Sequence, residues 1–132
     1  LPLWIGGSSA AAIRRTVRYG TGWIAGIEPP EEAAVTVAAI KAGAAEAGRE
    51  IDPDHFGGGF FFRFAEPREA AEPLSPIMGV GTVIGDAQMI LERIRAFEAG
   101  GMTKLILRPR ANDDEDVLAQ TRRLIAEVLP RV

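Results

Sequence analysis

The sequence predicts an α/β fold built from four strand–helix units. Short apolar segments alternate with longer segments whose apolar residues recur at helical spacing. Glycine and proline separate most of these segments, as they do in turns. Such alternation implies parallel strands joined by right-handed crossovers. Four units are half of an eight-unit barrel, although the periodicity alone equally allows an open four-stranded parallel sheet.

The first unit is an apolar strand over residues 1–5, a Gly-Gly-Ser-Ser turn over residues 6–9 and a helix over residues 9–19. The two glycines let the backbone turn sharply and approach a ligand closely. The serines are natural N-cap residues, and the first helical turn presents free N–H groups at the positive end of the helix dipole. These features make a small anion site that suits phosphate. A strand-to-helix turn that binds nothing is equally compatible with these residues.

The second unit begins after Gly20–Gly22, which ends the first helix. We predict a strand at Trp23–Ile27 and then a helix that opens with Pro29-Pro30-Glu31-Glu32 and ends near Gly48. Proline fits the first turn of a helix, and acidic residues favour its N-terminal dipole.

The third unit follows a turn at residues 52–54 and has its strand at Phe56–Phe64. Because residues 59–62 leave no polar face, we expect this strand to be covered on both sides. Glycines 57–59 either let another backbone or a ligand come close, or form a bulge or flexible lead-in. Residues 66–85 are the least regular segment, with a short helix expected around 68–74. So long a connection is typical of a lid or an insertion.

The helix of the third unit is capped by Asp86 and ended by Gly100-Gly101, and the fourth unit begins after it. A strand follows at Thr103–Leu107, and the acidic residues 112–116 start a last helix that stops at Pro130. For the four helices, the residues expected to face inward are Ala10, Ile13 and Val17; Ala33, Val37, Ile40, Ala44 and Ala47; Ala87, Ile90, Leu91, Ile94 and Phe97; and Val117, Leu118, Leu124, Ile125, Val128 and Leu129.

Composition indicates one domain over residues 1–132, large enough for its own core. With 47% hydrophobic and 25% charged residues the balance is that of a globular protein, and a net charge of -3 argues against a nucleic-acid partner. Cysteine is absent, so neither a disulfide framework nor thiolate chemistry is expected. No apolar run is long enough for a membrane span, and no signal peptide is visible. We predict a cytoplasmic protein, and a chain that starts at Leu1 is expected to be a processed chain, a cloned domain or a fragment.

Several other residues are weaker candidates for a site. Histidine is a common general base, which makes His55 a candidate, but its place in a turn favours a surface role. Arg108 and Arg110 follow the fourth strand and either meet an anionic ligand or pair with the acids at 113–116. Those acids lack the spacing of a metal site and are better explained as a helix start, so no metal is predicted.

Aromatic and basic residues near the first turn are further candidates. Trp4 and Trp23 are expected in the core, although an aromatic ring near a strand end could touch the ring of a bound ligand. Arg14 and Arg15 could add positive charge for an anion, but arginines on a helix are more often solvated or paired.

Two segments resemble luciferase-like monooxygenases, the flavin- or deazaflavin-dependent oxidoreductases of the bacterial luciferase type. The first combines the PLWIGGSS segment at 2–9, the two helical arginines and the YGTGW segment at 19–23. The second is EAGGMTKLILRP at 98–109. The resemblance covers nearly all of this chain but only the later part of a family member. It implies the C-terminal half of a (β/α)8 TIM barrel. The helix start at 85–87 differs from the Gly-Thr-Pro type common in the family, but Asp86 still caps.

The resemblance also implies a cofactor and a function. In the family the matching turn holds the phosphate of FMN or of the deazaflavin coenzyme F420, and we carry this role to Gly6, Gly7, Ser8, Ser9 and Ala10. Catalytic residues are left unknown, because parts of the ring pocket come from upstream strands. We therefore predict the C-terminal portion of an oxidoreductase or monooxygenase acting on a small-molecule substrate. The alternative is a non-catalytic half-barrel module for phosphate-ligand binding or oligomerisation. Half a barrel exposes two strand edges and an apolar face, so we expect a homo-oligomer or docking with a missing N-terminal half.

Overall fold

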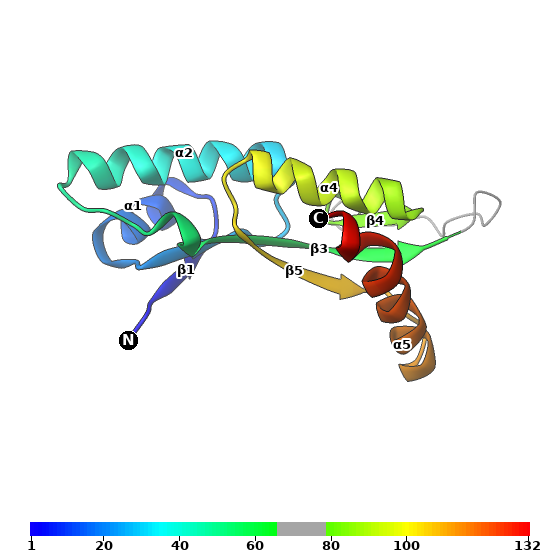
Figure 1. The fold of residues 1–132 in the computed structure, drawn as a ribbon. Helices are drawn as coiled ribbons and strands as arrows, with labels where there is room; N and C mark the ends of the chain where they lie inside the picture. The colour runs from blue at the N-terminus through cyan, green and yellow to red at the C-terminus, as the bar shows by residue number, and fades with distance from the viewer. Residues whose placement is uncertain (66–78) are drawn as a thin grey trace.

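The computed structural model describes residues 1–65 and 79–132, and within these residues five parallel strands form one sheet (Figure 1). The strands are β1 (Trp4–Gly6), β2 (Gly22–Ile24), β3 (Phe56–Phe64), β4 (Thr82–Gly85) and β5 (Lys104–Pro109). The helices are α1 (Ala10–Tyr19), α2 (Pro30–Glu46), α4 (Ala87–Ala99) and α5 (Asp114–Arg123). A 3-10 turn at Pro53–His55 leads into β3, a π-helical turn at Leu124–Val128 follows α5, and a 3-10 turn at Leu129–Arg131 ends the chain.

The sheet is organised around β3, its longest strand. β1 pairs with β2, β2 pairs with the start of β3, and β5 pairs with the other edge of β3. β4 pairs with the last residues of β3, on the same edge as β2 but further along it. The order β1-β2-β3-β5 follows the sequence, and each of these strands leads to a helix. The four predicted strand–helix units are therefore confirmed.

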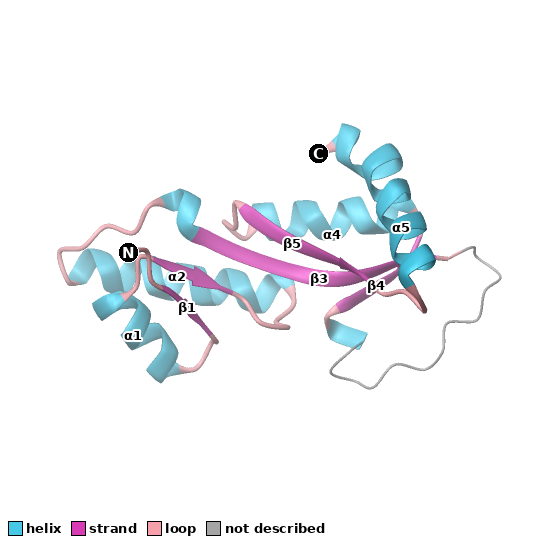
Figure 2. Ribbon diagram, turned by 90° about the horizontal axis from the view of Figure 1, so that it is seen from below, coloured by secondary structure: helices cyan, strands magenta, loops and turns pink. Residues whose placement is uncertain are grey.

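One face of the sheet carries the main helix layer. In Figure 1, α2 and α4 run along this face, and Figure 2 shows the opposite face with the strands nearer the viewer than these helices. On the helix side of β3, Phe60 stacks on Phe97 of α4 with ring centroids 6.1 Å apart, and Phe56 and Phe62 are fully buried. We call the other side, which includes Phe61 and Arg63, the open face. Both of these residues are only half-buried, so the expectation that the whole of β3 is covered on both sides was wrong for its carboxyl-terminal part.

The three glycines of β3 serve close packing of neighbouring groups. The ladder with β5 is continuous from Gly57 to Phe62, which rules out a bulge there. A Cβ atom on Gly59 would lie 2.3 Å from the carbonyl oxygen of Ile106, and one on Gly58 would lie 3.1 Å from the ring of Phe97. The close approach is thus made by another backbone and by core side chains, rather than by a ligand.

The helical part of the prediction is largely confirmed. α2 and α4 lie where expected, Ser9 and Asp86 cap α1 and α4, and most of the predicted inward residues of α2 and α4 are buried. Ala10 and Ala47 are exposed because they lie at or beyond the ends of their helices. In α1, the fully buried side chains are instead Ala12 and Thr16, with Ile13 and Val17 packed partly against the core.

The short strands depart from the predicted boundaries for local reasons. β1 starts at Trp4 rather than Leu1, because the backbone of Leu3 bonds to Thr21 instead of to a ladder partner. β2 ends at Ile24, since the backbone N–H of Gly26 donates to the carboxylate of Glu28 at 2.6 Å and the chain turns away.

Later segments also differ from expectation. β4 was missed, because four residues within an irregular segment carry no period of their own. The short helix expected at 68–74 lies outside the described residues. At the end of the chain Leu124 and Val128 are buried as predicted. The other four predicted inward residues, between 38% and 56% exposed, are Val117, Leu118, Ile125 and Leu129.

The reason for this last difference is the position of the final helix. α5 lies at the carboxyl end of β3, and it reaches the sheet through the buried polar residue Gln120 rather than through an apolar stripe. The π-helical turn then changes the spacing so that only two apolar residues return to the core. An apolar surface on α5 is left exposed.

Candidate functional site

The Gly-Gly-Ser-Ser turn lies between the carboxyl end of β1 and the start of α1. Gly7 has a φ of 92°, a backbone conformation that favours glycine. The hydroxyl of Ser9 accepts from the backbone N–H of Ala12 at 3.2 Å and so caps α1. The indole N–H of the fully buried Trp23 donates to the carbonyl oxygen of Gly7 at 2.9 Å. A core side chain therefore fixes the position of the turn.

The same turn is open to solvent. Ser8, Ser9 and Ala10 are exposed, and α1 has no acidic residue in its first turn. The first N–H groups of a helix have no partner within the helix and carry its positive dipole end. Residues 6–10 therefore fit a phosphate group by accessibility, backbone geometry and charge.

The helical arginines lie further along α1. Arg14, Arg15 and Arg18 are exposed and, with Ala11 and Tyr19, line a shallow depression of about 340 Å³. Among the described residues no hydrogen bond or ion pair joins these arginines to residues 6–10. A larger depression of about 610 Å³ lies between the start of α2 and α4, and none of residues 6–10 lines it.

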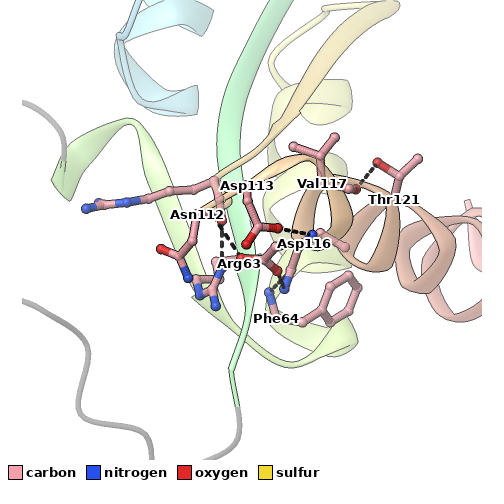
Figure 3. A network of polar contacts seen from close by, with 9 residues as sticks. Arg63, Phe64, Asn112, Asp113, Asp116, Val117 and Thr121 are labelled. Carbon is pink, nitrogen blue, oxygen red and sulfur yellow. Dashed lines mark hydrogen bonds and ion pairs between the residues drawn. The ribbon is translucent and has the colours of Figure 1, made fainter.

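A second polar cluster lies where β3 ends and α5 begins (Figure 3). Arg63 of β3 donates to a carboxylate oxygen of Asp116 at 2.7 Å and to the carbonyl oxygen of Arg110 at 3.0 Å. The side-chain oxygen of the buried Gln120 accepts from the backbone N–H of Phe64 at 2.7 Å, and its amide donates to Asp116 at 3.2 Å. These bonds tie α5 to the carboxyl end of β3.

The electrostatics of this cluster centre on Asp116. The hydrogen bond from Arg63 lowers the pKa of its carboxyl group, with further help from the backbone N–H of Asn112. Sequence reasoning missed Arg63 as a site residue. The available signal was a single charged residue within the otherwise aromatic stretch that ends β3, which indicates a charge with a specific partner.

Arg108 and Arg110 were expected either to meet an anion or to pair with the acids at 113–116. Within the described residues no such pair forms: Asp116 bonds Arg63, and the side chain of Asp113 accepts from the backbone N–H of Asp116 as the cap of α5. The guanidinium carbon of Arg108 lies 5.7 Å from the ring centre of Phe61. The Nη1 atom of Arg110 is buried and has no hydrogen-bond partner among the described residues.

His55 lies at the amino end of β3, the opposite end of the strand from Arg63. Its Nδ1 atom is 2.8 Å from the carbonyl oxygen of Thr21, and its ring is 5.6 Å from that of Trp4. These contacts give it a packing role rather than a place among the residues at the carboxyl ends of the strands. Trp23 lies in the core as predicted, whereas Trp4 is half-buried on the open face.

Metal-binding and membrane-spanning features are both lacking in residues 1–65 and 79–132. No group of three or more histidine, cysteine or acidic residues in them is arranged to hold a metal ion. No helix among them is long and apolar enough to cross a bilayer.

Comparison with known proteins gives one sequence match and several structural ones. The model of a family described as luciferase-like monooxygenase matches residues 1–78. No curated protein matches the chain.

Three solved structures are similar in fold. A coenzyme F420-dependent tetrahydromethanopterin reductase from Methanopyrus kandleri matches with a TM-score of 0.68 and 15% identity, over 98% of this chain and 50% of its own. An F420-dependent secondary alcohol dehydrogenase, solved with an F420-acetone adduct, matches with a TM-score of 0.67 and 15% identity, over 97% of this chain and 49% of its own. A riboflavin lyase, solved with modified FMN and riboflavin, matches with a TM-score of 0.67 and 18% identity, over 97% of this chain and 42% of its own.

The chain thus spans about half the length of these structures. Together with the parallel order β1-β2-β3-β5, this confirms the predicted α/β fold of four βα units that make half of a (β/α)8 TIM barrel. The extra strand β4 is an addition to that plan at the end of β3.

Proposed function

Because the chain belongs to the luciferase-like monooxygenase family, we propose that it contributes the cofactor-phosphate turn of a flavin- or deazaflavin-dependent oxidoreductase. The observation that carries the proposal is the turn at Gly6–Ala10. It is exposed, has the backbone of a tight glycine turn, and opens a helix with no acidic residue in its first turn. The family match over residues 1–78 includes this turn.

Each residue of the turn has a distinct task in this proposal. The backbone N–H groups of Ser8, Ser9 and Ala10 donate to the phosphate oxygens, and the hydroxyl of Ser8 adds a further donor. Gly6 and Gly7 keep side chains away from the phosphate. The bond from Trp23 to Gly7 holds the turn in place before the ligand arrives, which lowers the entropic cost of binding. When bound, the coenzyme supplies the redox chemistry, and the protein orients it and excludes water.

The identity of the coenzyme stays open between two candidates. Two of the similar structures are F420-dependent enzymes, whereas the riboflavin lyase was solved with modified FMN. Both coenzymes carry a phosphate, so the turn serves either. The substrate is a small molecule. Since this chain spans about half of its structural neighbours, we propose that the ring pocket and catalytic groups are completed by a second half of the barrel.

Exposed apolar side chains support that second half. They lie just before β1, on the open face of β5, on α5 and in the helical turns that follow it, and include Leu3, Ile106, Leu118, Ile125 and Leu129. Large exposed apolar side chains in this number favour a partner that covers them. The partner that fits best is an N-terminal half barrel, because it would cover the open face and pair with both β1 and β5. A second copy of this chain is the alternative.

A charge placed in the turn tests the proposal. Ser8→Asp puts a negative charge beside the bound phosphate and is expected to weaken binding of FMN or F420 at least about 100-fold, measured by fluorescence titration. Ala39→Asp adds the same charge at an exposed position of α2 and serves as the control. Equal affinities for the wild type and Ser8→Asp would remove the turn from the site.

The alternative function is a non-catalytic half barrel that binds a phosphate ligand or mediates oligomerisation. The observation that favours this alternative is that the chain covers only about half of each neighbour, so it lacks part of an enzyme of that size. The two functions differ in one measurement, because only the enzyme turns over a substrate in the presence of reduced coenzyme. Phosphate binding that stays intact without turnover, even after an N-terminal half is supplied, would favour the module.

A further inference from the structure

Three arginines lie on the open face at the carboxyl ends of β3 and β5. Arg63 lies on β3, Arg108 on β5, and Arg110 directly after β5. Alternate residues of a strand share a face, which places Arg108 and Arg110 on one side. The guanidinium of Arg108 lies over the ring of Phe61, and that of Arg63 donates to the carbonyl oxygen of Arg110. These contacts and the strand register place the three residues at one end of the sheet on the open face, and we call them the arginine cluster.

The charges of this cluster are unbalanced. Asp116 is the carboxylate that bonds this cluster: one of its oxygens accepts from Arg63 and from the backbone of Asn112, and the other accepts from Gln120. Within residues 1–65 and 79–132, neither Arg108 nor Arg110 forms an ion pair with an acidic residue. Asp116 thus pairs with one of the three arginines, and an anion bound by Arg108 and Arg110 would add a second negative charge to the cluster.

Arg110 gives the most specific indication. Its Nη1 atom is buried without a hydrogen-bond partner in the described part of the chain. Buried donors almost always have a partner, and each exception calls for an explanation such as a missing ligand or water. The guanidinium fork matches the two oxygens of a carboxylate or phosphate group. Arg108 is exposed and Arg110 is half-buried, so part of each side chain is accessible to solvent.

We propose that Arg108 and Arg110 bind a carboxylate or phosphate group of the substrate, at a site separate from the turn at Gly6–Ala10. Strands β2 and β3 lie between β1 and β5, so the two anion positions are apart. Arg63 is a positioning residue, because it holds the backbone of Arg110 while Asp116 neutralises its charge. Assigning this anion to the substrate rests on the proposed function, in which residues 6–10 hold the coenzyme.

Titration with two simple anions tests the site. Inorganic phosphate and succinate are titrated separately by calorimetry into the wild type, Arg110→Gln and Arg108→Gln, at constant ionic strength. We expect Arg110→Gln to weaken binding of the preferred anion at least about tenfold, and Arg108→Gln to weaken it less. The control is Arg122→Gln, which removes an exposed charge of α5 and should change the affinity less than about twofold. Which anion binds more tightly tells carboxylate from phosphate.

Affinities for FMN and F420, measured with the same variants and with Ser8→Asp, distinguish a failure of this inference from a failure of the proposed function. If Arg110→Gln loses the anion while Ser8→Asp retains it, the arginine site stands, whatever Ser8→Asp does to coenzyme binding. If coenzyme affinity depends on Arg110 and not on Ser8, the arginines hold the coenzyme phosphate and the inference is overturned. Anion affinities that are unchanged in both arginine variants, or lowered equally in Arg122→Gln, also overturn it. The exposed Arg108 keeps the test valid if Arg110→Gln fails to fold.

Discussion

The turn after β1 presents backbone N–H groups and hydroxyls to solvent, whereas the segment after β5 uses its acidic groups to hold α5 against β3. At the end of β1, the indole N–H of the buried Trp23 donates a hydrogen bond to the carbonyl oxygen of Gly7 in the turn. At the second strand end, Arg63, Asp116 and Gln120 bond one another and the backbone on both sides. Both ends follow parallel strands of one sheet, yet the first leaves its donors open to solvent and the second bonds its polar groups within the protein.

We call the first region, residues 6–10, the binding turn. We call the second, made of Arg63, Asp116 and Gln120, the anchor of α5. A turn made of backbone donors needs no partner charge and stays available for a ligand. An anchor made of charged side chains satisfies its own groups and contributes stability. Beside the anchor, the Nη1 atom of Arg110 has no hydrogen-bond partner within the described residues. This exception is therefore informative. Four sets of substitutions test this contrast between the two regions.

The largest effect is expected from a glycine-to-alanine substitution on β3. The same substitution at the end of β1 is its comparison. A Cβ atom in Gly59→Ala would lie 2.3 Å from the backbone oxygen of Ile106, so β5 must move away from β3. We expect a loss of about 3 kcal/mol or more in the free energy of unfolding, measured in urea. In Gly6→Ala the nearest atom is 3.6 Å away, and a change below about 0.5 kcal/mol is expected. Equal losses would contradict the described strand packing.

The next effect tests the anchor through its buried amide. Gln120→Leu leaves the buried backbone N–H of Phe64 without its partner and is expected to cost about 1–3 kcal/mol of stability. Gln88→Leu, an exposed site on α4, is the control. Hydrogen exchange should locate the loss at the end of β3 and in α5. Unchanged stability of Gln120→Leu would mean that the Arg63–Asp116 pair and the apolar contacts of residues 124 and 128 suffice to hold α5.

A smaller effect is expected at the binding turn. Ser9→Ala removes the hydroxyl that accepts from the backbone of Ala12 and should lower stability by about 1 kcal/mol. The cap of α1 is Ser9 and not Ser8, so Ser8→Ala should leave the melting temperature almost unchanged while it weakens coenzyme binding. A melting temperature lowered more by Ser8→Ala than by Ser9→Ala would show that the cap has been misassigned.

The smallest effect is a pH dependence confined to the anchor. Arg63 lowers the pKa of Asp116 in the folded protein below its ordinary value of 3.8, so the ion pair stabilises the fold above that value. As the pH falls through the folded pKa, the carboxylate gains a proton and this contribution is lost. Urea midpoints measured from pH 6 downwards should fall less steeply for Asp116→Asn than for the wild type. Parallel curves would remove Asp116 from the acid response.

Sequence reasoning was accurate where the signal is local. The caps at Ser9 and Asp86, the helices α2 and α4, and the whole of β3 follow from residues within a few positions of one another. The turn at 6–10 could be proposed as a site for the same reason, because its glycines, serines and helix start are consecutive.

The rest depends on contacts between distant segments. Arg63 and Asp116 are 53 positions apart, and only the pairing of β3 with β5 brings α5 close enough for their bond. β4 is too short to show a period and forms because the end of β3 offers a free edge. The exposed apolar residues of α5 follow helical periodicity correctly, but the described chain holds nothing for them to pack against.

The most direct test of the binding turn is amide NMR of the uniformly 15N-labelled protein during titration with FMN and, separately, F420. We predict that the backbone amide signals of Ser8, Ser9 and Ala10 shift together and saturate with one of the two coenzymes. Riboflavin, which lacks the phosphate, should leave these signals in place. Saturable binding of either coenzyme that moves other amides and leaves residues 6–10 unshifted would contradict the proposed role of the turn.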